Sequence, residues 1–139
     1  MEDVVAKANA YWESTVKEIK SYNGERRNAP KMITTSQIRK FLTAVNSVAN
    51  KVTIFKAQNQ GIKELSDDLA AEIKYLQVPL VYQAGRESSR DRTIKDFIKK
   101  TNIIEYINSI GTDLKAFETF AKYIEALVAY HKYYGGKDK

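Results

Sequence analysis

The sequence contains no cysteine, and this absence excludes several kinds of site at once. Disulfides, thiolate metal sites and cysteine nucleophiles all require that side chain. Histidine is almost as scarce, because His131 is the single residue of its type. It falls between Tyr130 and Lys132 on a segment with helical spacing, so we expect a structural or surface role for it rather than the role of a catalytic base.

Glycines and carboxylates do not form the groupings that catalysis or metal binding needs. The six glycines are scattered along the chain, so no phosphate-cradling loop of the Walker or dinucleotide type is present. Asp67, Asp68 and Glu72 lie close together, but they begin an expected helix, where the helix dipole favours acids, and Asp67 and Asp68 point to different sides. We therefore predict no catalytic residue, no metal site and no cofactor.

Long apolar runs are also missing, and none approaches the ~20 residues of a membrane span. The first residues carry Glu2 and Asp3 where a signal peptide needs positive charge. Both features predict a soluble protein of the cytoplasm with no membrane partner. The net charge of +6, from 23 basic and 17 acidic residues, favours a polyanionic partner without identifying it.

Apolar residues recur at helical spacing along most of the chain, and no long alternation predicts a strand. A chain of 139 residues has the size of one domain with one core. Because the links between the helices are short, we expect antiparallel neighbours, and the fold class is all-α, a single compact bundle of about five helices. The expected helices run from about Asp3 to Lys20, from Thr34 or Ser36 to Gln58, from Ser66 through Val81, between Arg90 and Gly111, and from Thr112 to about Tyr134.

Several helix boundaries can be predicted from local signals. Thr34 and Gln37 have the spacing of a capping box. Pro79 costs the third helix a backbone hydrogen bond and should kink it one turn upstream. The pattern leaves a break near Thr101 in the fourth helix open, and Thr112 is expected to cap the fifth. Residues 1–139 are thus a single helical domain with an N-terminal helix (1–20), a basic linker (21–33), a helical core (34–134) and a frayed tail (135–139).

Four of the nine tyrosines lie near the end of the last helix. Tyrosine rings can stack on the bases of single-stranded nucleic acids. Positions 123, 127, 130 and 134 follow helical spacing, however, so core packing with the hydroxyl at the surface is favoured. The tyrosines concerned are Tyr123, Tyr130, Tyr133 and Tyr134.

Positive charge is concentrated in two segments. Residues 17–40 contain seven basic residues against two acidic ones, and residues 86–100 contain six against three. On the second helix, Lys51 recurs on the side of Lys40 three turns later. Long cations on a solvent face bind phosphates without reading sequence. For any single residue, an ordinary solvated face explains the charge equally well.

Three stretches of the sequence together resemble a known family. They are ITTSQIRKFL (33–42), LVYQAGRE (80–87) followed by IKDFI (94–98), and YIEALVAYHKYYGG (123–136). In this order and spacing they resemble the small subunit of the type III-A CRISPR effector, the Csm complex. The resemblance covers roughly residues 30 to 138 and leaves the first helix and the basic linker outside it.

This resemblance implies a helical, non-enzymatic subunit of a prokaryotic, cytoplasmic ribonucleoprotein that acts in antiviral defence. Several copies would stack as a minor filament, and their partners would be guide RNA, target RNA, other copies of the chain, and the backbone and large signature subunits of the complex. The resemblance assigns RNA binding to Arg39, Arg86 and Lys95, and more weakly to Lys132. Lys40 and Lys51 are added to this set from helix geometry.

Two other functions stay open at this stage. One is a helix-turn-helix DNA-binding protein, with Ser36, Gln37 and Arg39 at the start of a recognition helix. That motif needs a preceding helix only three or four residues away, whereas residues 21–31 form a longer segment containing Pro30. The other is a pure protein adaptor whose charges are only solvated.

Overall fold

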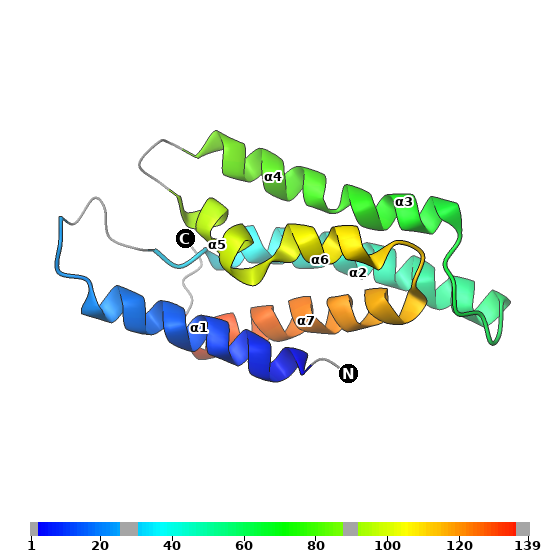
Figure 1. Cartoon of the computed structure of the whole chain (residues 1–139), viewed down its shortest axis with the longest axis horizontal. Coiled ribbons are helices and arrows are strands. Elements are labelled where there is room, and N and C mark those ends of the chain that lie inside the picture. The colour runs from blue at the N-terminus through cyan, green and yellow to red at the C-terminus, as the bar shows by residue number, and fades with distance from the viewer. Residues whose placement is uncertain (1–2, 26–30, 88–91, 136–139) are drawn as a thin grey trace.

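The computed structural model describes residues 3–25, 31–87 and 92–135, and their regular structure is helical apart from an isolated bridge between Glu64 and Asp113 (Figure 1). The predicted all-α fold is therefore confirmed. Arg26, Arg27, Pro30, Arg90 and Gly136 lie outside the described residues. The helices are α1 (Val4–Ser21), α2 (Thr35–Gln58), α3 (Asp67–Tyr75), α4 (Gln77–Arg86), α5 (Thr93–Thr101), α6 (Ile103–Ile110) and α7 (Leu114–Tyr133).

Side-chain caps fix where several helices begin. The capping box expected at α2 is present: Gln37 N donates to Thr34 Oγ1 at 3.2 Å, and Thr34 N donates to Gln37 Oε1 at 2.9 Å. The expected cap of the last helix is wrong by one residue. Asp113, not Thr112, accepts from Ala116 N at 3.2 Å, and the Thr112 carbonyl instead accepts from Leu65 N at 2.7 Å.

The third and fourth expected helices are each divided into two. Leu76 separates α3 from α4, one turn before Pro79, as predicted. Pro79 is then the third residue of α4, where its missing N–H is not needed for an intrahelical bond. Asn102 separates α5 from α6 with a left-handed φ of 56°, a conformation that asparagine tolerates better than most residues.

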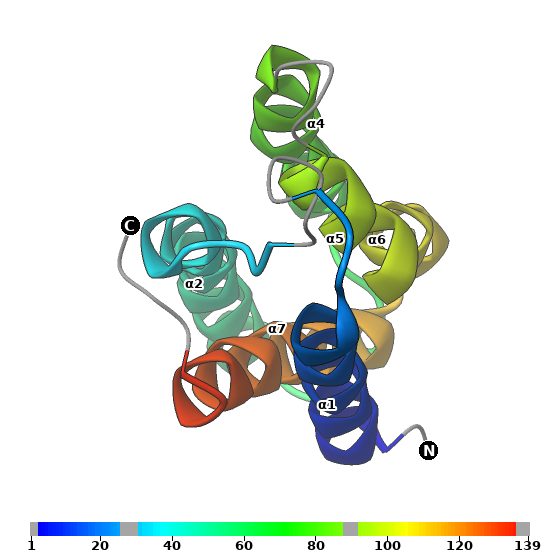
Figure 2. The ribbon, with the colours of Figure 1, turned by 90° about the vertical axis from the view of Figure 1, so that its left-hand side faces the viewer.

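Helix α7 lies at the centre of the packing and contacts α1, α2 and α6. Helices α3 and α4 form an outer layer, in which α3 packs on α2 and α6, and α4 packs on α5 (Figures 1 and 2). Trp12 anchors α1 because its fully buried ring donates from Nε1 to the Leu127 carbonyl at 2.8 Å. The buried aromatic core around it is formed by Phe41, Phe97, Phe117, Phe120 and Tyr123.

His131 is buried in this core, so its role is structural. Its Nε2 lies 2.6 Å from the Ile33 carbonyl, and its ring packs edge-on against Trp12. The imidazole therefore ties α7 to the segment that enters α2. Burial lowers the pKa of His131, and the nearby charge of Lys132 lowers it further, although the bond to Ile33 opposes both effects.

The prediction that the C-terminal tyrosines pack in the core holds for some of them. Tyr123 is buried, and Tyr134 is partly buried with its hydroxyl donating to Asn9 Oδ1 at 2.6 Å. Tyr130 is also partly buried. Tyr133, which falls outside the helical spacing of positions 123, 127, 130 and 134, is 77% exposed. It lies on the side of α7 that faces away from the buried residues Leu127 and His131.

Candidate nucleic-acid interface

Five helix ends meet at one end of the molecule. The carboxyl ends of α1, α4 and α7 and the amino ends of α2 and α5 all lie on the left in Figure 1. Figure 2 looks onto this end and shows α1, α2, α4 and α5 arranged around it. We call this region the basic end. Cations lie in these helix ends or just before them, namely Lys17, Lys20, Lys31, Arg39, Lys40, Arg86, Arg92, Lys95, Lys99 and Lys132.

The basic end brings together the described parts of the two segments of excess positive charge, which residues 41–85 separate in the sequence. Five of the six residues predicted to bind RNA belong to it, and only Lys51 lies farther along α2. The opposite end carries acidic residues where α3 and α7 begin, at Glu64, Asp67, Asp68 and Asp113. Lys63 and Lys115 lie beside these acids, and Glu18, Glu87 and Asp96 lie among the cations of the basic end. The basic end therefore has an excess of positive charge, whereas the opposite end is mixed.

Arg86 and Lys95 are positioned by the corner between α4 and α5. The Arg86 guanidinium lies over the Tyr82 ring, 5.7 Å from its centroid. The next residue, Glu87, accepts backbone hydrogen bonds from Ile94 and from Lys95 N at its carboxylate, the second at 3.4 Å. Because this carboxylate caps α5 from outside the helix, the family-like stretch LVYQAGRE positions the stretch IKDFI directly.

Arg39 and Lys40 are exposed neighbours in sequence but point to different sides of α2, since consecutive helical residues are rotated by about 100°. Lys40 lies on the side that faces α4. Lys51 is on the same flank, as expected from helix geometry, but its Nζ lies 2.6 Å from Glu72 Oε1 on α3. Both side chains of this pair are substantially exposed, so the ion pair adds little stability.

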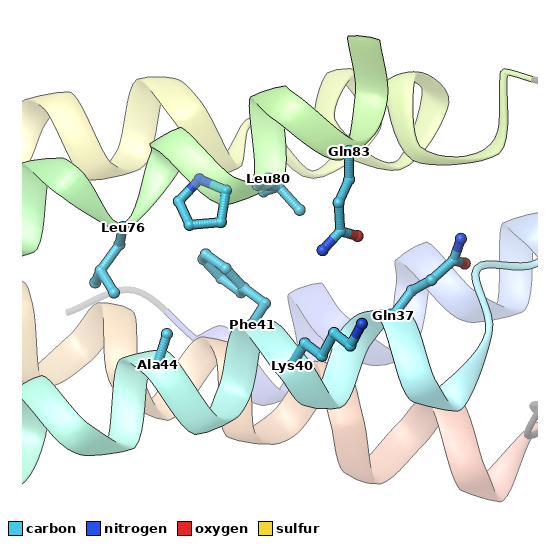
Figure 3. A pocket seen from close by; sticks show the side chains of 8 residues that line it. Gln37, Lys40, Phe41, Ala44, Leu76, Leu80 and Gln83 are labelled. Carbon is cyan, nitrogen blue, oxygen red and sulfur yellow. The ribbon is translucent and has the colours of Figure 1, made fainter. Parts of the chain in front are cut away.

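A hollow of about 40 Å³ lies between α2 and α4 (Figure 3). Its apolar walls come from both helices, and Lys40 lies at its edge. Two glutamines, Gln37 and Gln83, join Lys40 there. Sequence reasoning did not assign Gln83 a role, although it lies three residues before Arg86 in the same motif and therefore on a neighbouring part of the same helix face. The apolar lining is formed by Phe41, Ala44, Leu76, Pro79 and Leu80.

The described residues offer little for catalysis or metal binding. Among them, no group of three or more histidines or carboxylates is arranged to hold a metal ion. The imidazole of His131 is buried and bonded to a backbone carbonyl, so it cannot reach a bound ligand as a base. Within the same residues, no helix is long and apolar enough to cross a bilayer. The basic end presents cations and side-chain amides that are held on helices.

Comparison with known proteins shows which family this chain is similar to. The model of the family described as Csm2 Type III-A matches residues 13–137. A CRISPR-system Csm2 protein of Streptococcus thermophilus is 41% identical over 107 residues, which are 77% of each chain. One from Enterococcus italicus is 36% identical over 104 residues, covering 73% of this chain and 68% of that protein, and one from Mycobacterium tuberculosis is 33% identical over 107 residues, covering 77% and 79%. The family match begins at residue 13, so it includes the second half of α1 and the linker, which the sequence motifs left outside.

Proposed function

The chain belongs to the Csm2 family of type III-A CRISPR systems, and from this membership we propose that it is a non-catalytic subunit that holds RNA by its sugar-phosphate backbone. As a small subunit of the Csm complex, it would stack with other copies in a minor filament in the prokaryotic cytoplasm. Guide RNA and target RNA would run past the basic ends of successive copies. The backbone and large signature subunits would complete the assembly and supply its catalysis.

The observation that carries this proposal is the convergence of Arg39, Lys40, Arg86, Lys95 and Lys132 at the basic end. Cations on rigid helices bind phosphates whatever the base sequence. An RNA duplex presents phosphates and 2′-hydroxyls, while its base edges are hard to reach, and pairing between guide and target supplies the specificity. Each copy then needs only a weak affinity for RNA, because many copies along the filament bind the same RNA and their combined affinity is much higher.

The helix-turn-helix alternative is disfavoured by the length of the connection before α2. Residues 22–34 separate α1 from α2, far more than the turn that this motif allows.

The adaptor alternative has one supporting feature. The outward face of α3 and α4 exposes the large apolar side chains Tyr75, Val78, Val81 and Tyr82, and such faces are common at protein interfaces. A pure adaptor predicts that RNA in the complex forms no crosslinks to this chain.

Replacing Arg39, Arg86 and Lys95 with alanine in the assembled complex tests the proposal. We expect weaker target-RNA binding and a salt dependence of log Kd that is shallower by about 1 for each cation that no longer neutralises a phosphate. The matched control replaces three exposed lysines outside the basic end, Lys63, Lys74 and Lys115, and should leave both quantities unchanged. If the complex assembles and the two triple variants bind RNA alike, the basic end is not the RNA-binding surface.

A further inference from the structure

The hollow between α2 and α4 combines three polar side chains of complementary chemistry. Gln37 and Lys40 come from α2, and Gln83 comes from α4 (Figure 3). In Figure 3 the amide of Gln83 extends from α4 toward Lys40 across the hollow. The other side chains that line the hollow are apolar, so the polar groups are gathered at one edge of it.

The two glutamine amides differ in how they are held. Gln37 Oε1 accepts the bond from Thr34 N in the capping box, which fixes the side chain and leaves its NH₂ group to donate outward. Gln83 forms no hydrogen bond within the described part of the chain, so both its oxygen and its NH₂ group are available. A ligand in the hollow therefore meets the Gln83 amide, which can both donate and accept, whereas the Gln37 amide is directed away from the hollow (Figure 3).

The volume of the hollow limits what can enter it. A water molecule needs roughly 10–15 Å³ of such space, so about 40 Å³ admits a hydroxyl group with its carbon but not a nucleobase. The apolar walls, among them Phe41, Pro79 and Leu80, suit the carbon atoms of a sugar ring. A hydroxyl on such a ring is both donor and acceptor, and it matches the Gln83 amide.

We propose that this hollow binds the ribose 2′-hydroxyl of an RNA strand, with Gln83 at the hydroxyl and Lys40 at an adjacent phosphate. The proposal rests on the RNA-binding function proposed above and adds discrimination against DNA. Arg86 lies three residues after Gln83 on α4, so it can contact a further phosphate of the same strand. The cations then provide affinity for any nucleic acid, and the hollow selects RNA by its sugar.

The test is an NMR titration of the ¹⁵N-labelled chain of 139 residues, which is small enough for its side-chain amides to be observed directly. Three duplexes of one sequence serve as probes: RNA, DNA, and RNA carrying 2′-fluoro sugars, which keeps the A form but has no 2′-hydroxyl. We expect the Gln83 amide signals to shift with RNA only. Signals of Arg39 and Arg86 should shift with all three probes.

Two variants give a second readout. Gln83→Ala should weaken RNA binding about 2- to 10-fold, the usual loss for one hydrogen bond, and leave binding of the other two duplexes unchanged. Gln58→Ala, which changes an exposed glutamine at the far end of α2, should alter none of the three affinities.

The outcomes separate the two proposals. If the basic end responds to nucleic acid but the Gln83 amide responds equally to all three duplexes, or if Gln83→Ala weakens all three alike, the ribose site is refuted and backbone binding stands. If no signal of the basic end responds to any duplex or to single-stranded RNA of the same sequence, the proposed function fails and the ribose site fails with it.

Discussion

At the scale of single residues, His131 makes the stability of the fold depend on pH. Burial lowers its pKa in the folded chain below the ordinary value of about 6.5, so the unfolded chain binds a proton at a higher pH than the folded one. The free energy of unfolding should therefore be highest above about pH 6.5 and fall as the pH drops through this value, by up to about 1.4 kcal/mol per pH unit. Denaturant unfolding between pH 5 and 8 measures this slope.

The variant His131→Gln provides the control for this prediction. A glutamine NH₂ can donate to the Ile33 carbonyl, as the imidazole does, but it does not titrate. Because the chain has no other histidine, the slope between pH 5.5 and 7 should largely disappear in this variant. A slope that persists unchanged would assign the pH dependence to carboxylates and not to His131.

At the scale of helices, the start of α5 depends on a carboxylate from outside that helix. The residue that precedes α5, Arg92, provides no side-chain cap, and Glu87 instead accepts from the first backbone N–H groups of the helix. Glu87→Ala should therefore lower the free energy of unfolding by roughly 0.5–2 kcal/mol, the usual loss for a helix cap. Glu125→Ala, on an exposed position within α7, should cost far less. Equal losses in thermal or denaturant unfolding would contradict this role of Glu87.

Two helix boundaries were predictable from local sequence signals. The capping box of Thr34 and Gln37 and the kink before Pro79 depend on residues within one turn, and both predictions are confirmed. The cap of α7 was misassigned because Thr112 and Asp113 are both capping residues, and only the contact between Thr112 and Leu65 decides between them. The division at Asn102 lies one residue from the break that the pattern left open near Thr101, and the left-handed conformation of Asn102 fixes it there.

At the scale of the whole molecule, the arrangement of the candidate site could not be read from the sequence. The sequence located two basic segments, but their meeting depends on α2 and α5 starting at the same end of the bundle. Ion pairs between separate helices, such as Lys51 with Glu72, likewise cannot be predicted from the spacing of apolar residues. The hollow between α2 and α4 exists only after packing, which is why Gln83 was missed.

The excess of positive charge at the basic end leads to a prediction that distinguishes the effect of where a cation lies from the effect of the net charge of the chain. The double variant Arg39→Gln with Gln58→Arg moves one arginine along α2 from the basic end to the far end, and it leaves composition and net charge unchanged. Arginine near the carboxyl end of a helix is favourable, so folding should not suffer. We expect the assembled complex to lose as much RNA affinity as with Arg39→Gln alone, and the salt slope to fall by about 1 in both variants. Restored affinity in the double variant would mean that net charge attracts the RNA and that the basic end has no special part in holding it.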